Sequence, residues 1–262
     1  MRQGIATSMG VEALQIPMFG LYGACSTSGE ALALASMSAA AGYGGTMIAV
    51  TSSHFGSAEK EFRFPLGYAN QRPLSSHWTV TGSGAFLVQS AEEYRKQNTK
   101  SYFSNIRITG VTVGKIVDYG LKDSQNMGAC MAPAAMDTIV QNFQDMERKE
   151  KDYDRIITGD LGSIGRTILF DLIREKGYDI CEKHMDCGMT IFDKERQDTH
   201  AGGSGCGCAA VTLASYVLPK LEKGEWKRVL FVPTGALMST VSFNEGASVP
   251  GIAHGIVLES DA

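Results

Sequence analysis

Two predicted helices of this chain carry almost no charge, and this constrains the fold more than any other feature. The segment Thr27–Ala41 contains a single charged residue, Glu30, and the segment Gly207–Leu218 contains none. A helix that is apolar on all sides must be covered on all sides, and both segments are too short to span a membrane. We therefore expect a central layer of two buried helices between two sheets.

The same two segments also look like copies of each other. Residues Leu32–Ser36 (LALAS) align with Val211–Ser215 (VTLAS). Each predicted helix follows a turn rich in Gly, Ser and Cys, and each precedes an apolar strand, Thr46–Ser52 or Arg228–Thr234. This pattern predicts an internally duplicated unit of strand, turn, helix and strand.

The remaining periodicity is that of an α/β protein. Helices are expected at Met136–Glu150, where apolar residues fall on one stripe, and at Ile164–Lys176, which Gly177 would close. Further strands are predicted at Ile16–Ala24, Thr79–Gln89, Ile106–Val117, Tyr153–Gly159 and His254–Glu259.

Composition excludes several classes of function. The net charge is −4, which argues against nucleic acid as a partner because binding phosphates requires clustered Lys and Arg. A membrane-spanning helix needs about 18 or more consecutive apolar residues, and no apolar run in this sequence is that long. The six cysteines match no disulfide framework, which indicates reduced thiols in a cytosolic setting. Cys206 and Cys208 have no second cysteine pair, so we predict no metal site.

The sharpest local feature is the turn that carries Cys25. The run from Gly20 to Gly29 reads GLYGACSTSG, and it leads from a predicted strand into the first uncharged helix. At a helix N-terminus the unsatisfied N–H groups and the dipole favour negative charge, so the pKa of the thiol should fall below its usual value. Ser26 and Thr27 could cap the helix. The alternative is a cysteine that is buried only because it is small.

Two other turns could face Cys25. The first contains His200, Gly203, Ser204 and Gly205, where glycines expose backbone N–H groups. His200 is either a base or, as we favour, a hydrogen-bonded structural residue. The second turn contains Asp160 at the end of a predicted strand, where ligands collect in α/β sheets; Asp160 is otherwise a helix cap.

Basic and imidazole groups follow the strand Thr46–Ser52. His54 comes directly after it, and Arg63 and Arg72 are the cations expected nearest the mouth of a cleft. The alternative for both arginines is a surface ion pair.

Many of these motifs resemble the thiolase and ketoacyl synthase superfamily and, within it, a family of stage V sporulation proteins tied to dipicolinic acid. The matching segments run through nearly the whole chain: GLYGACSTS (20–28), TSSHF (51–55), FRFP (62–65), NQRP (70–73), WTVTGSGA (78–85), NMGACMAPAA (126–135), TGDLGSIGR (158–166), DCG (186–188), AGGSGCGC (201–208), FVPTGALMS (231–239) and PGIAH (250–254).

The resemblance implies a five-layer αβαβα fold of two similar halves, residues 1–120 and 121–262. The family has an opening segment before the point where this chain begins, so the first half is expected to be incomplete and residues 1–15 to form the end of a helix. A truncated product, an alternative start or a fragment would each explain this.

The resemblance also implies a loss of catalysis. Condensing enzymes of the superfamily pair the cysteine with two histidines, or with a histidine and an asparagine. Cys25 matches the nucleophile, but the turn at His200 (HAGGSG) is one residue shorter than the family's histidine motif. The second histidine would fall in TGDLGSIG, which has none. Losing a general base costs about 10²–10⁴ in rate, so we predict no catalytic residue.

The function implied by the resemblance is binding of dipicolinate, with its calcium, for uptake into the developing spore. The expected partners are the membrane channel proteins of the same stage V sporulation A operon. The protein would be cytoplasmic, peripheral to the inner spore membrane, without a cofactor, and a homodimer through Thr79–Gln89. The alternatives are an active acyltransferase using Cys25 and a scaffold subunit that binds no ligand. The predicted ligand-binding residues are Cys25, Ser26, Thr27, Ser28, His54, Asp160, His200, Gly203, Ser204 and Gly205.

Overall fold

The computed structural model describes the main chain of residues 3–62, 72–97 and 105–261. Its helices are α1 (Gln3–Glu12), α2 (Thr27–Ala40), α3 (Phe55–Phe62), α4 (Ala91–Gln97), α5 (Met127–Asp145), α6 (Gly162–Glu175), α7 (Cys187–Thr190), α8 (Cys206–Thr212), α9 (Leu218–Glu222) and α10 (Thr240–Asn244). Its strands are β1 (Thr46–Ser53), β2 (Trp78–Thr79), β3 (Gly82–Gln89), β4 (Ile106–Thr112), β5 (Arg155–Thr158), β6 (His184–Asp186), β7 (Gly203–Ser204), β8 (Arg228–Val232), β9 (Thr234–Ala236), β10 (Gly251–Ala253) and β11 (Gly255–Ser260).

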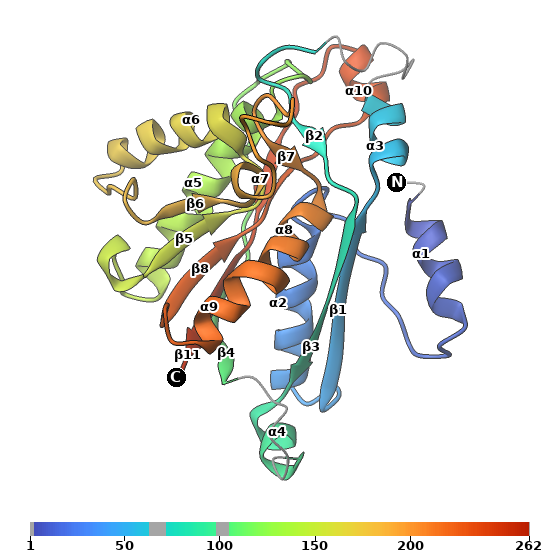
Figure 1. Cartoon of the computed structure of the whole chain (residues 1–262), viewed down its shortest axis with the longest axis vertical. Coiled ribbons are helices and arrows are strands. Elements are labelled where there is room, and N and C mark those ends of the chain that lie inside the picture. The colour runs from blue at the N-terminus through green and yellow to red at the C-terminus, as the bar shows by residue number, and fades with distance from the viewer. Residues whose placement is uncertain (1–2, 63–71, 98–104, 262) are drawn as a thin grey trace.

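A five-stranded mixed sheet in the order β4-β11-β8-β5-β6 organises the larger part of the molecule. Strand β5 is parallel to both β6 and β8, and β11 is antiparallel to both β8 and β4. One face of this sheet packs on α5 and α6 through a core that includes Ile156, Leu230 and Val257. Figure 1 shows both helices on that side of the sheet.

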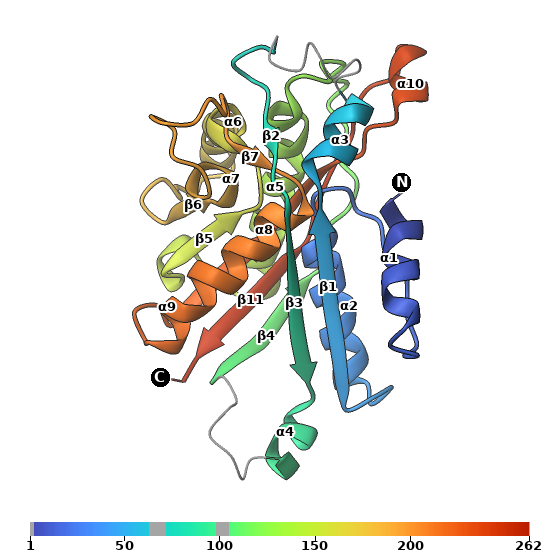
Figure 2. The same cartoon turned by 45° about the vertical axis from the view of Figure 1, so that its right-hand side comes forward.

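The opposite face of the sheet packs on the central helices that the uncharged segments predict, although Leu34 and Met37 of α2 remain 37% and 50% exposed. Ile157, Phe231 and Ile256 share a core with small and apolar residues of α2 and α8. Helix α8 continues through a π-helical turn (Leu213–Val217) into α9. The antiparallel pair of β1 and β3, which are separated in the chain by α3 and β2, covers the far side of α2 and α8 (Figure 2). The described layers are therefore helices, sheet, helices and a two-stranded sheet.

The end of β1 and the short strands β2 and β7 meet near the start of α8. Ser53, the last residue of β1, accepts a hydrogen bond from the N–H of Gly207 at 3.0 Å and donates one to the carbonyl of Val80 at 2.7 Å. Strand β2 pairs in parallel with β7, so Thr79 lies beside Ser204. These contacts bring the turn before α8 to the same end of the molecule as the start of α2.

The predicted strand Ile16–Ala24 is wrong. Residues 16–22 form no regular strand, and Gly23 and Cys25 share only an isolated bridge. Side chains in this segment are exposed, with Phe19 84% exposed and Ile16 47%. A strand requires a neighbour to satisfy its backbone groups, and none of the described strands pairs with this segment.

Other boundaries differ from the prediction for local reasons. The expected strand Thr79–Gln89 is two strands, because β2 pairs with β7 and β3 pairs with β1. Helix α5 begins nine residues earlier than predicted, where the side chain of Asn126 caps it by accepting from the N–H of Ala129. Strand β4 precedes residue 120 yet pairs with β11, so the division into halves at that residue stays a prediction.

Candidate functional site

The Cys25 turn is braced by its own hydroxyl groups. Ala24 has a positive φ of 51°, which turns the chain sharply before α2 begins. Ser26 Oγ donates to the carbonyl of Gly23 at 2.6 Å, and Thr27 Oγ1 donates to the carbonyl of Ala24 at 2.6 Å. Our expectation that these side chains cap the helix is wrong, because neither of them accepts from a helical N–H. Ser26 and Thr27 therefore hold the shape of the turn.

Asp160 connects this turn to the facing half of the molecule. Its Oδ2 atom accepts hydrogen bonds from Ser204 Oγ at 3.0 Å and from the N–H of Gly205 at 2.9 Å. Its Oδ1 atom accepts from Thr234 Oγ1 at 3.1 Å. Ser204 Oγ lies 3.7 Å from Cys25 Sγ. The structure thus brings together four predicted site residues, Cys25, Asp160, Ser204 and Gly205, and adds Thr234.

The electrostatics of this cluster oppose a thiolate. Burial raises the pKa of the Cys25 thiol well above its usual value, and the nearby Asp160 carboxylate raises it further. Our expectation of a lowered pKa is wrong, because desolvation and a neighbouring negative charge outweigh the helix dipole. Burial also raises the pKa of Asp160 to about 6, although its hydrogen bonds favour the ionised form. Near neutral pH the site holds a neutral thiol beside a carboxylate.

Asp186 supports the loop that carries Asp160, and the sequence reasoning missed it. Its carboxylate accepts hydrogen bonds from Thr158 Oγ1 at 2.7 Å and from the N–H groups of Leu161, Gly162 and Met189 at 2.9, 3.2 and 3.1 Å. This fixes the turn after β5 and the start of α7 together. The only signal in the sequence is the DCG motif that begins with Asp186.

The two predicted histidines do not join the cluster. The backbone of His200 has a φ of 51°. Its Nδ1 atom is 2.8 Å from the carbonyl oxygen of Pro73, and its Nε2 atom is 3.0 Å from the carboxylate of Asp198. These contacts fit the structural role that we favoured. His54 is exposed, and none of the hydrogen bonds between described residues joins it to Cys25 or Asp160.

The remaining predicted residues have distinct environments. Ser28 lies buried in the first turn of α2, and its hydroxyl has no hydrogen-bond partner among the described residues. Gly203 pairs with Trp78, and a Cβ atom there would lie 2.8 Å from Ile191. Gly205 has a φ of 106°, which favours glycine, and its N–H is already used by Asp160. The predicted donors of this turn are thus partly occupied by the protein.

Arg72 lies near this end of the molecule, whereas Arg63 lies outside the described residues. The guanidinium of Arg72 stacks on the Trp78 ring at 4.0 Å and is 3.5 Å from the carboxylate of Asp198. Arg72 and its two partners, Trp78 and Asp198, line a pocket of about 330 Å³ together with Phe192. The described part of the chain has no group of three His, Cys, Asp or Glu side chains that could hold a metal ion.

Comparison with known proteins identifies the family. The family model for stage V sporulation protein AD matches residues 1–259. Stage V sporulation protein AD of Bacillus subtilis strain 168 is 41% identical over 259 residues, which cover 99% of this chain and 73% of that protein. The chain belongs to the stage V sporulation protein AD family. It is therefore a sporulation protein, as the resemblance implied.

Solved structures confirm the thiolase-like fold class. The tetronic acid condensing enzyme AbyA1 superposes with a TM-score of 0.61 at 13% identity, covering 98% of this chain and 73% of the enzyme. The 3-oxoacyl-[acyl-carrier-protein] synthase III of Aquifex aeolicus superposes at 0.54 with 12% identity, covering 98% and 71%. The Acat5 thiolase of Ascaris suum, solved with coenzyme A, superposes at 0.58 with 10% identity, covering 98% and 84%.

These neighbours are enzymes, while the family relative is named for sporulation. At such low identity the likeness to the enzymes concerns the fold alone. Among the described residues, no helix combines the length and the apolar character that crossing a bilayer requires.

Proposed function

We propose that this protein binds dipicolinate, as its calcium complex, at the Cys25 turn and performs no acyl transfer there. The resemblance of the chain supports the ligand, and one observation carries the binding-only role: Asp160 lies where it raises the pKa of the Cys25 thiol. A condensing enzyme needs the opposite, because the thiolate is the nucleophile.

The neighbours of Cys25 support the absence of turnover. The Cys25 side chain contacts Ser204 and Asp160, and the two predicted histidines are engaged elsewhere or exposed. Asp160 itself is a poor base for this thiol, since its pKa of about 6 lies far below that of the buried thiol. Proton transfer from Cys25 to Asp160 is therefore unfavourable.

The charge of the site supports calcium dipicolinate over the free dianion. Asp160 and Asp186 are buried carboxylates, and each would repel a bare dicarboxylate. A one-to-one complex of Ca²⁺ with dipicolinate is neutral, and calcium takes oxygen ligands such as a carboxylate. Asp160 Oδ1 accepts one hydrogen bond, from Thr234, so a lone pair is left for such a contact. The Ser28 hydroxyl is a further donor without a described partner.

The proposed assembly places this protein at the inner spore membrane with the membrane channel proteins of its operon, as a homodimer. The open edge of β3 supports the dimer: within the described sheets β3 pairs with β1 alone, and Leu87 on it is 60% exposed. An edge strand of this kind pairs readily with a second copy.

Titration of the purified protein with calcium dipicolinate tests the binding site. Cys25→Trp should abolish binding because the indole would occupy the place beside Ser204 and Asp160, while Cys181→Trp, in the segment after α6, should bind as the wild type does. Circular dichroism should show that both variants are folded. Equal affinity of a folded Cys25→Trp variant would place the ligand elsewhere and refute the site.

A further inference from the structure

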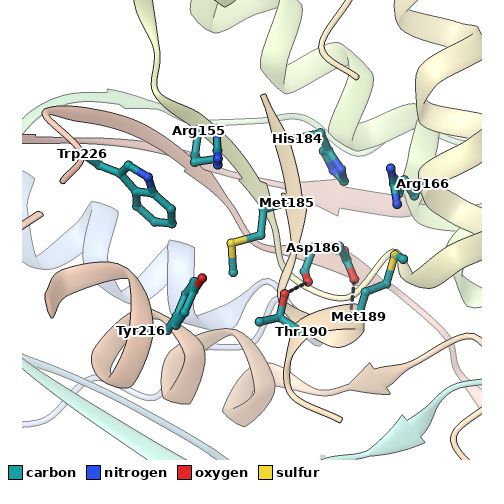
Figure 3. Close-up of a pocket in the computed structure, with 9 residues that line it drawn as sticks. All are labelled: Arg155, Arg166, His184, Met185, Asp186, Met189, Thr190, Tyr216 and Trp226. Atoms are coloured by element: carbon teal, nitrogen blue, oxygen red, sulfur yellow. Dashed lines mark hydrogen bonds between the residues drawn. The ribbon is translucent and has the colours of Figure 1, made fainter. Parts of the chain in front are cut away.

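A second pocket lies at the β6 edge of the five-stranded sheet. It has a volume of about 320 Å³ and is lined in part by β6, the edge strand. Figure 3 shows its lining, which comes from β5, β6, α6, α7, the π-helical turn and the loop before β8. This volume is at the small end of ligand pockets, which suits a single-ring molecule.

Two arginines without an ion-pair partner give this pocket its charge. Arg155 donates to the neighbouring carbonyl of Asp154 at 2.9 Å, and Arg166 lies over the ring of Phe170 at 5.1 Å. Within the described chain, neither guanidinium forms an ion pair, whereas Arg174 on the same helix as Arg166 pairs with Asp171. A guanidinium in this state presents donors that match a carboxylate.

Asp186 and His184 also line the pocket, and both are engaged by other groups of the protein. The Asp186 carboxylate is occupied by the four donors described above. His184 Nε2 lies 3.0 Å from Thr158 Oγ1, which itself donates to Asp186, so the imidazole donates to Thr158 through Nε2. Burial and Arg166 hold the pKa of His184 at about 3.

Aromatic rings form an apolar wall on the side of the pocket where Arg155 lies. Tyr216 and Trp226 meet edge to face with 6.0 Å between their centroids, and Arg155 lies 5.5 Å from the Trp226 ring. Met185 projects from β6 between this aromatic pair and Arg166 in Figure 3. Flat rings stack on such surfaces, and a thioether adapts to their shape.

We propose that this pocket binds a small aromatic carboxylate, with the carboxylate at Arg166 and the ring against Met185, Tyr216 and Trp226. The pocket is distinct from the Cys25 turn, so the proposal stands or falls independently of the function proposed above. Dipicolinate free of metal and other one-ring carboxylates share this chemistry, and the experiment separates them.

Benzoate is the first probe, and benzamide is its uncharged match. Titration followed by protein chemical shifts should show benzoate binding that moves the Trp226 indole N–H signal, with benzamide at least tenfold weaker. Arg166→Gln should weaken benzoate at least tenfold, because a charge-assisted hydrogen bond is lost. Arg174→Gln, a neighbouring exposed arginine on α6, is the matched control and should leave the affinity unchanged.

Displacement identifies the source of the ligand. Dipicolinate in excess chelator should compete with benzoate if it is the natural occupant; failure to compete, with benzoate binding intact, assigns the pocket to another aromatic carboxylate. Cys25→Trp should change neither result. The proposal is overturned if benzoate fails to bind at 10 mM-scale concentrations, about the weakest useful affinity, if benzamide binds equally, or if Arg166→Gln binds as well as the wild type.

Discussion

At the scale of residues, the cluster around Asp160 is governed by the cost of burying charge. The carboxylate accepts three hydrogen bonds and still has a pKa of about 6. Hydrogen bonds to an ionised group normally lower its pKa. Desolvation therefore dominates here, and the same desolvation keeps the Cys25 thiol protonated.

Asp160 should make the protein less stable as the pH rises. Its folded pKa of about 6 exceeds the usual 3.8, so the folded state binds more protons between these values. Stability is then greatest below about pH 4 for this group and falls as pH rises through about 6, by up to about 3 kcal/mol. Asp160→Asn should flatten this dependence. Urea denaturation at pH 5 and pH 8 measures it, and an unchanged difference in the free energy of unfolding would contradict the assignment.

Alkylation tests the electrostatic coupling between Cys25 and Asp160. Iodoacetamide at pH 8 should modify Cys25 more slowly than a free thiol, because the thiolate reacts. Asp160→Asn should accelerate the reaction by about tenfold for each unit by which the pKa of Cys25 falls. The rate at the partly exposed Cys181 serves as the control and should not change. A Cys25 that reacts faster than a free thiol in the wild type would restore the expectation of an activated nucleophile.

The sequence located the members of the site better than it predicted their roles. Glycine-rich turns and strand ends pointed to Cys25, Asp160 and Ser204 because these motifs are local in the chain. The hydrogen bonds from Thr234 and to Asp186 join segments more than 20 residues apart, and no spacing rule predicts such partners. The sequence predicted that Ser26 and Thr27 bind the ligand. Their hydroxyls donate to carbonyls of the same turn, and only the backbone conformation of the turn reveals this.

At the scale of elements, lack of charge was the most reliable signal. It predicted that α2 and α8 pack together in a central layer, and they do. The expectation that α2 is covered on all sides is wrong, because Leu34 and Met37 are 37% and 50% exposed. Apolar character alone failed for Ile16–Ala24, since apolar residues make a strand only where a partner strand lies beside them. The π-helical turn between α8 and α9 left no trace in the periodicity.

A charge placed within α2 tests the enclosure of this helix. Ala35 is buried at 7% exposure between the five-stranded sheet and the β1–β3 pair, whereas Ala40 at the end of the helix is exposed. Ala35→Lys should lower the free energy of unfolding by about 3–5 kcal/mol, because an unpaired charge and excess volume enter a packed layer. Ala40→Lys should change it by less than about 0.5 kcal/mol. Similar urea midpoints for the two variants would mean that α2 is not enclosed.

At the scale of the whole molecule, one face of the layered structure is open. On the outer face of the β1–β3 pair, Ile48 is 55% exposed, Val50 is 47% exposed and Leu87 is 60% exposed. Apolar side chains gathered on one sheet face mark a surface that another element or molecule covers. The internal repeat predicted a duplicated unit, and α2 and α8 run in the same direction in Figure 1. The division into halves at residue 120 stays a prediction, because β4 pairs with β11 in the five-stranded sheet.

A homodimer through β3 makes a direct prediction about this open face. The wild type should sediment as a dimer at micromolar concentration, and Leu87→Lys should sediment as a monomer, because lysine on an edge strand opposes strand pairing between copies. Val113→Lys is the matched control: Val113 is 63% exposed but follows β4, on a different sheet, so this variant should remain dimeric. Sedimentation velocity distinguishes the species. A monomeric wild type, or a Leu87→Lys dimer as stable as that of Val113→Lys, would mean that β3 is not the dimer interface. Another molecule or segment would then have to pack on the apolar face of the β1–β3 pair.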